Sequence, residues 1–167
     1  VQHKWAPDTE SARTFYRRLD DAFGRLAALD GTLALTADHG MSDKSDDAGR
    51  PNVIWLQDLL DARFGKGETT VICPITDAFV VHHGALGGLV RVWIRGAVQA
   101  QEVIAYVAAL PGVHQALDRA SACRQYDMPP DREADVVVIS DAGTCIGASQ
   151  ADHDLSALEG HRLRTHG

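Results

Sequence analysis

The chain has 167 residues, of which 45% are hydrophobic and 23% charged, a length and composition that suit one ordinary globular domain with its own core. Its 23 acidic and 16 basic residues give a net charge of -7, which argues against nucleic-acid binding because phosphate backbones are bound by clustered Lys and Arg. The longest apolar stretch is interrupted by His82, His83 and Arg91 and is too short to span a bilayer. We therefore predict neither a nucleic-acid nor a membrane partner, while a small anionic substrate remains open.

Cysteine usage and the start of the chain suggest its cellular setting. Cys73, Cys123 and Cys145 are far apart and form no C-x-x-C motif. This spacing argues against a disulfide framework or a structural zinc knuckle and favours a cytoplasmic location. The chain starts at Val1 with neither an initiator methionine nor a signal-peptide pattern, so we expect the true N-terminus to lie elsewhere, with a removed signal peptide left open.

The first third of the chain predicts two helices separated by a strand and a loop. A long amphipathic helix is expected from an N-cap at Asp8 to Asp30-Gly31. Residues 32–37 are apolar and predict a short strand buried on both faces. Residues 41–51 are polar and predict an exposed loop, and residues 53–64 predict a helix that ends before Gly65.

The rest of the chain alternates strand and helix patterns. Strands are predicted at residues 69–75 and 89–94, and helices at 99–110 and 113–126. A further buried strand is expected at residues 135–140, after which 143–160 shows only weak periodicity. The middle of the chain therefore predicts a compact strand-and-helix module.

Asp38-His39-Gly40 directly follows the predicted strand at residues 32–37. In open α/β sheets ligands collect at the carboxyl ends of strands, so this position makes the tripeptide a candidate site. A carboxylate oxygen and a neutral imidazole are a normal zinc pair, and Gly40 would let the chain turn so that both side chains reach one ion. For the tripeptide alone a plain turn that caps the next segment is the simpler explanation, and the metal site stays open as the alternative.

The eight histidines differ in their settings. His82 and His83 interrupt an apolar run, where an imidazole pair must be either hydrogen-bonded in the interior or functional, and both interpretations stay open. His3 precedes the first helix and His166 lies at the opposite end of the chain, and neither is informative alone. The other histidines stand in polar or helical stretches and are interpreted as surface or structural residues: His114, His153 and His161.

Five segments in chain order resemble the phosphonoacetate hydrolases, which belong to the alkaline phosphatase superfamily together with nucleotide pyrophosphatase/phosphodiesterases. The resemblance covers nearly the whole chain, so it is more specific than any one tripeptide. The segments are Gln2-His3-Lys4, Leu35-Thr36-Ala37-Asp38-His39-Gly40-Met41, Val81-His82-His83-Gly84-Ala85-Leu86-Gly87, Asp131-Arg132 and Leu163-Arg164-Thr165-His166-Gly167.

The resemblance implies an α/β fold of the alkaline-phosphatase-like sandwich type, incomplete in this chain, with a smaller α+β cap module. On this basis residues 1–67 belong to the metal-binding α/β core. Residues 68–130 form the cap-like module. Residues 131–167 return to the core with the late metal-ligand histidine.

The same resemblance implies two zinc ions in the intact subunit. One zinc is held by His3 and His166 together with an Asp that would fall before Val1. The other zinc is held by Asp38 and His39, or by one of these two residues while the rest bridges. The remaining ligands, including a Thr nucleophile, are expected upstream of this chain. We therefore expect weak or absent zinc binding and no activity from these residues alone, since a catalytic zinc has about three protein ligands.

The implied reaction is hydrolysis of the C–P bond of phosphonoacetate to acetate and phosphate by attack of the Thr hydroxyl on phosphorus. His82 and His83 are candidates for lining the substrate pocket, and Arg162 and Arg164 for support near His166, unless the two arginines are a solvated surface pair. A homodimer remains open. Two alternatives are kept, namely a phosphodiesterase or nucleotide-pyrophosphatase-like hydrolase, and a non-catalytic module that retains the fold.

Overall fold

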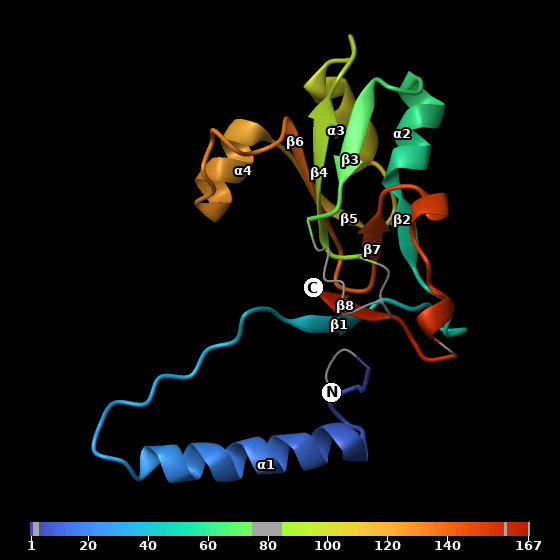
Figure 1. Cartoon of the computed structure of the whole chain (residues 1–167). Helices are drawn as coiled ribbons and strands as arrows, with labels where there is room; N and C mark the ends of the chain where they lie inside the picture. The colour runs from blue at the N-terminus through green and yellow to red at the C-terminus, as the bar shows by residue number, and fades with distance from the viewer. Residues whose placement is uncertain (2–3, 75–84, 159, 167) are drawn as a thin grey trace.

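A four-stranded antiparallel sheet lies at the centre of the computed structural model (Figure 1), which describes residues 1, 4–74, 85–158 and 160–166. The strand order is β3-β4-β6-β5, and every neighbouring pair runs antiparallel. The strands are β3 (Thr69–Ile72), β4 (Leu89–Ile94), β5 (Val113–Asp118) and β6 (Val136–Ser140). β4 and β6 lie where the sequence predicted strands, so those two predictions are confirmed.

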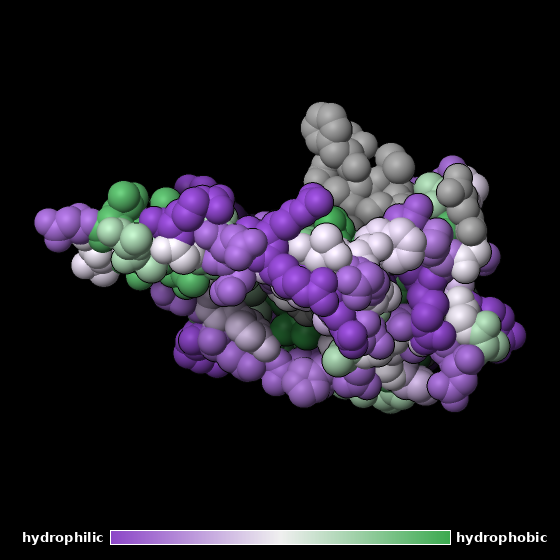
Figure 2. Space-filling view, turned by 90° about the horizontal axis from the view of Figure 1, so that it is seen from below, coloured by the Kyte–Doolittle hydropathy of each residue, from purple (hydrophilic) through white to green (hydrophobic). Residues whose placement is uncertain are grey.

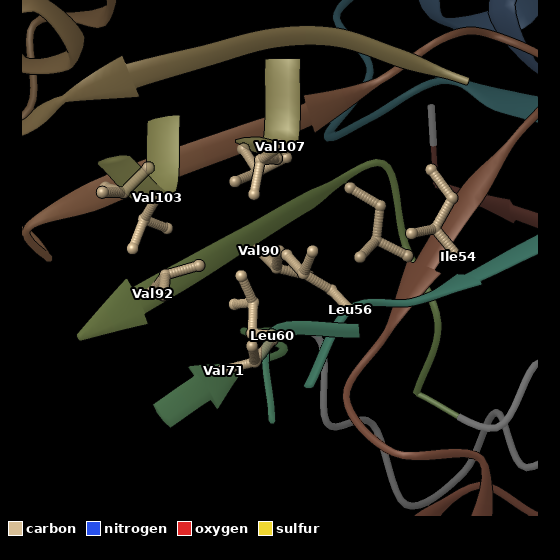
Figure 3. Close-up of a cluster of buried hydrophobic side chains, with 11 residues drawn as sticks. Ile54, Leu56, Leu60, Val71, Val90, Val92, Val103 and Val107 are labelled. Carbon is tan, nitrogen blue, oxygen red and sulfur yellow. The ribbon is translucent and has the colours of Figure 1, made fainter. Parts of the chain in front are cut away.

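Two helices, α2 (Leu56–Phe64) and α3 (Ala100–Ala108), supply apolar side chains to one face of this sheet. Alternate residues of a strand point to the same face, so Val90 and Val92 of β4 both enter the core. Figure 3 shows them beside Leu60 of α2 and Val103 of α3, all fully buried. Burying each such side chain contributes about 1.5–3 kcal/mol, which makes this cluster the main source of stability in the described chain.

The expected helix at residues 113–126 is wrong in its first half. Residues Val113–Asp118 form β5, which pairs with β6, and only Arg119–Tyr126 forms a helix, α4. Asp118 marks the change, because its carboxylate accepts a hydrogen bond from the backbone N–H of Ser121 and caps the helix. Pairing with the apolar β6 outweighs the helical propensity of the segment, a tertiary effect that periodicity does not report.

Two short two-stranded sheets adjoin the central sheet in Figure 1, one beside its lower end and one below it. β2 (Val53–Trp55) pairs in parallel with β7 (Cys145–Gly147), and β1 (Met41–Asp43) pairs antiparallel with β8 (Arg164–His166). The predicted exposed loop at 41–51 therefore contains a strand, and the predicted helix at 53–64 begins three residues late, at Leu56. Both errors share one cause, since each strand has only three residues and is defined by a partner more than 90 positions away.

The first helix, α1 (Glu10–Ala27), lies apart from the central sheet at the bottom of Figure 1. Its N-cap is Thr9, one residue after the expected Asp8, and the Thr9 hydroxyl accepts a hydrogen bond from the N–H of Ala12. The strand expected at residues 32–37 is wrong for this structure, because the segment has no regular secondary structure. Two single-turn 3-10 helices, Gln150–Asp152 and Ser156–Leu158, complete the elements of the described chain.

The mixed α/β class is confirmed, whereas the sandwich, the cap and their boundaries stay predictions. β6 follows residue 131 in the chain yet pairs with β4 and β5, so the central sheet combines residues on both sides of that expected boundary. None of the described helices is long and apolar enough to cross a bilayer.

Lys44 anchors the end of β1 in the interior. Its side chain is only 1% exposed, its N–H donates to the carbonyl of Leu163, and its carbonyl accepts from the N–H of Asn52. Burial lowers the pKa of Lys44, and the nearby Cys145 and Asp141 act in the opposite direction. Folding therefore transfers an ammonium group into surroundings that disfavour its charge.

We predict that Lys44→Met raises the free energy of unfolding at neutral pH by about 1 kcal/mol, because it removes a buried charge and keeps the chain length. A lysine whose pKa is lowered on folding binds more protons when unfolded, so stability rises as pH approaches the ordinary value of 10.5. The difference between Lys44→Met and the unsubstituted protein should therefore shrink between pH 7 and pH 10.5. Urea denaturation at several pH values measures this difference in the free energy of unfolding. A difference that stays constant with pH would contradict the role assigned to the buried charge of Lys44.

Arg91 and Glu133 form a bidentate ion pair beside the sheet. Arg91 Nε and Nη2 lie 2.8 and 3.1 Å from the two carboxylate oxygens of Glu133, whose side chain is 2% exposed. Burial on its own would raise the pKa of the Glu133 carboxyl, but hydrogen bonds from Arg91 and from the N–H of Ala134 hold it below its ordinary value of 4.5.

We predict that Glu133→Gln lowers the free energy of unfolding by about 3 kcal/mol at neutral pH, because it leaves the Arg91 charge partly buried without its carboxylate. A carboxyl whose pKa is lowered on folding stabilises the fold above its unfolded pKa, so the loss should diminish as pH falls below 4.5. Arg50→Gln is the matched control, since it breaks the exposed pair of Arg50 with Asp46 and should cost less than about 1 kcal/mol. Equal effects of the two substitutions in urea denaturation would contradict the prediction.

Candidate functional site

Asp38 and His39 occupy a bend immediately before β1. The chain bends at Asp38, and the Asp38 carboxylate turns back to accept a hydrogen bond from the N–H of His39 at 3.1 Å. Its other oxygen lies 3.4 Å from His39 Nε2. Gly40 does not have a positive φ and has room for a Cβ, so the bend does not depend on the expected freedom of this glycine.

His166 meets His39 because β1 and β8 pair. The register places Met41 opposite His166, so the residues just before β1 lie beside the last residue of β8. The two Nε2 atoms are 3.1 Å apart, with ring centroids 4.0 Å apart and planes at 71°. His39 Nδ1 lies 3.0 Å from the Gly40 carbonyl, which can only accept, so the ring proton belongs on Nδ1 and the Nε2 lone pair faces His166.

Arg164 shares the face of β8 that carries His166, since alternate residues of a strand point the same way. It is only 7% exposed. Together with His39 it lines a cavity of about 190 Å³, whose other walls come from α1, from residues that precede it and from the segment before β1: Trp5, Pro7, Tyr16, Ala37, Gly40 and Met41. The cavity therefore combines a guanidinium with an imidazole.

Arg162 behaves differently from Arg164. Its Nε lies 2.5 Å from Asp43 Oδ2 and its Nη2 3.1 Å from the carbonyl of Ser45, and its side chain is 47% exposed. The expectation of a solvated pair of arginines therefore holds for Arg162 and is wrong for Arg164. Alternation would not separate them, because residues two apart share a face, whereas β8 begins at Arg164 and leaves Arg162 outside the strand.

The remaining predicted residues lie elsewhere. His3, His82 and His83 fall outside the residues that the structure describes. Three other histidines make structural contacts: His114 lies 3.8 Å from Asp141, His153 accepts from the N–H of Ala148, and His161 packs edge-on against Trp5. That last contact brings the segment just before α1 against the segment just before β8.

The donor atoms of Asp38, His39 and His166 fit zinc in kind. Two ligands of one tetrahedral zinc, each about 2.1 Å from the ion, lie roughly 3.4 Å apart, close to the observed 3.1 and 3.4 Å. Over residues 1, 4–74, 85–158 and 160–166, however, no three His, Cys, Asp or Glu side chains are grouped so that they could hold an ion by themselves. A complete site therefore requires further ligands, and the division of His39 and His166 between two zinc ions stays a prediction.

Solved structures confirm the resemblance that the sequence indicates. The whole chain aligns with phosphonoacetate hydrolase from Sinorhizobium meliloti, in complexes with phosphonoformate and with phosphonoacetate, at 42% identity and a TM-score of 0.91. Murine and human ectonucleotide pyrophosphatase/phosphodiesterase 5 match 99% of the chain at 19–20% identity, with TM-scores of 0.57 and 0.59. These latter matches show a shared fold alone.

The matches have unequal coverage. The chain spans 40% of the length of the Sinorhizobium enzyme and 39% of the two pyrophosphatase/phosphodiesterases. No protein-family model matches the chain.

Proposed function

We propose that this chain is the C-terminal, metal-binding portion of a zinc-dependent hydrolase of the alkaline phosphatase superfamily that cleaves the C–P bond of phosphonoacetate to acetate and phosphate. The observation that carries the proposal is the alignment of the whole chain with a phosphonoacetate hydrolase at 42% identity. The convergence of Asp38, His39 and His166 supports it independently, since the side chains predicted to bind zinc come together from opposite ends of the sequence.

In this proposal Asp38, His39 and His166, with His3, hold the zinc ions, and ligands from outside this chain complete both sites. Zinc bound there would supply Lewis-acid chemistry, lowering the pKa of a hydroxyl nucleophile and offsetting charge on phosphoryl oxygens. The residues of this chain orient the metal-binding side chains. The Gly40 carbonyl accepts from His39 Nδ1, which favours the tautomer that presents the Nε2 lone pair to a metal.

Arg164 is the residue of this chain that we expect to attract the anionic substrate. A guanidinium stays charged at all relevant pH values and presents paired N–H donors that match carboxylate or phosphonate oxygens. Its position in the cavity beside His39 gives an acidic chain a local positive site. His82 and His83 remain candidates for the substrate pocket, and the cytoplasmic location and the homodimer remain predictions.

We predict that His39→Ala or His166→Ala in the full-length protein lowers phosphate release from phosphonoacetate at least about 100-fold and lowers zinc content from about two ions per chain, because each substitution removes an imidazole ligand. Asp38→Asn should act in the same direction. His114→Ala is the control, since that exposed ring has no role in the proposal.

Enzyme assays and elemental analysis of the same preparations test this prediction. Absence of phosphate release by zinc-loaded unsubstituted protein would overturn the choice of phosphonoacetate. Hydrolysis of a nitrophenyl phosphodiester in its place would favour the phosphodiesterase alternative. Full zinc content and full activity in both histidine variants would overturn the metal assignment.

We predict further that Arg164→Gln lowers kcat/KM for phosphonoacetate roughly 10- to 100-fold, mainly through KM, because it removes a charge-assisted contact to an anion. Arg164→Lys should recover part of the loss, since it restores the charge without the planar fork. Arg162→Gln, which breaks the exposed contacts with Asp43 and the Ser45 carbonyl, is the matched control and should leave kcat/KM within about twofold. Steady-state kinetics that show equal KM values for the Arg162 and Arg164 variants would contradict the assignment.

A further inference from the structure

The two outer strands of the central sheet differ in how their free edges are treated. β3 and β5 end the strand order, so each has one edge that no strand of the sheet pairs. An open edge presents backbone N–H and C=O groups that can pair with another chain. A sheet that protects one of its edges and leaves the other open therefore has one preferred place for association.

Gln57 of α2 protects the edge of β3. Its side-chain Oε1 accepts a hydrogen bond from the N–H of Val71 at 2.7 Å, and its Nε2 donates to the carbonyl of Thr69 at 3.2 Å. Both backbone groups face away from β4, because bonded and non-bonded positions alternate along an antiparallel ladder. Asp61 Oδ1 accepts from the same Nε2 at 2.7 Å and so orients the amide. The Gln57 side chain thus takes the place of a neighbouring strand.

The free edge of β5 has no such protection at its centre. The N–H of Arg119, at the end of β5, donates to the carbonyl of Asp135 beside β6 at 3.2 Å. Since bonded and non-bonded positions alternate, Ala116, three residues earlier, directs its N–H and C=O away from β6. Within residues 1, 4–74, 85–158 and 160–166, no other backbone group and no side chain hydrogen-bonds the backbone of Ala116.

β5 is also accessible from solvent. Each of its residues is at least partly exposed, whereas β6 is buried at every residue except Ile139. Figure 2 shows mostly hydrophilic residues on the face that it draws, with smaller hydrophobic groups among them. Main-chain hydrogen bonds supply affinity when a strand is added to a sheet, so the edge of β5 can bind another strand without a large apolar patch.

The sequence of β5 is complementary to itself in the antiparallel direction. A two-fold axis at Ala116 brings each His114 beside Asp118 of the partner subunit, since both residues are two positions from the axis. The His114 side chain is 62% exposed, and the register shift beside it affects only that end of the strand. Opposite charges at cross-strand positions attract and like charges repel. The small side chain of Ala116 lets the two strands approach at the axis.

We infer that β5 is a homodimer interface, at which two copies pair their β5 strands antiparallel about Ala116 and join their central sheets into one continuous sheet. The inference goes beyond the proposed hydrolase reaction. It needs no catalytic activity, so the interface and the reaction can fail separately.

Sedimentation and hydrogen exchange of the full-length protein test the interface together. The protein should sediment as a dimer at micromolar concentration. Dilution to the monomer should accelerate exchange of the Ala116 N–H at least about 10-fold, while the Leu117 N–H, which faces β6, stays slow at every concentration. A protein that is monomeric at about 100 µM would overturn the inference. Exchange of Ala116 that does not change on dilution would also overturn it, because another segment or another surface would then be responsible.

A matched pair of substitutions in the full-length protein tests the register. His114→Asp should weaken dimerisation at least about 10-fold, because it places like charges opposite each other, whereas His114→Lys keeps opposite charges and should stay within about threefold. Equal dissociation constants for the two variants would overturn the register. Ala116→Pro removes the outward N–H, which an edge strand tolerates, and should abolish the dimer. A folded Ala116→Pro variant that still dimerises would overturn the interface, and the His114 variants decide if that variant does not fold.

Discussion

The pairing of β1 with β8 determines the whole candidate site. It joins residues that are 127 positions apart, His39 and His166, through a ladder only three residues long. A two-stranded ribbon of this length has little stability of its own, so its neighbours must hold it. Lys44 and Leu163 supply a backbone hydrogen bond at its end, and the buried hydroxyl of Thr165 donates to the carbonyl of Leu86. The approach of the two imidazoles is therefore a consequence of packing beneath β8 rather than of any attraction between the rings.

The two arginines at the start of β8 differ in burial and in partner. In β8, the side chain of Arg164 enters the cavity beside His39, while Arg162, just before the strand, is neutralised by Asp43 at the surface. A buried guanidinium at the cavity thus coexists with an excess of acidic residues over the whole chain. This arrangement suits a small anion, because the field at short range depends on the nearest charges, and salt screens the distant acidic ones within about 10 Å.

Sequence reasoning succeeded where local pattern and tertiary environment agree. Apolar side chains dominate two segments that are both strands of the central sheet, Leu89–Ile94 and Val136–Ser140. It failed at Met41–Asp43 and Val113–Asp118, because polar composition or ambiguous periodicity hid strands that depend on remote partners. The site residues were found through a resemblance spread over five segments, whereas the burial of Arg164 depends on its place in β8, a strand defined by its pairing with β1.

The strand expected at residues 32–37 shows a different limit of prediction from sequence. Strand formation is a relation between segments, so an apolar run without neighbours remains extended coil whatever its propensity. In the described part of the chain β2 to β7 share one buried core, while α1 and residues 28–40 bury only Ala12. Regions with few buried contacts open at low free energy. Asp38 and His39 lie where these two parts join. The β1–β8 ladder holds the residues that follow them, whereas residues 30–37 form no backbone–backbone hydrogen bond within the described chain. The positions of Asp38 and His39 therefore depend mainly on the β1–β8 ladder.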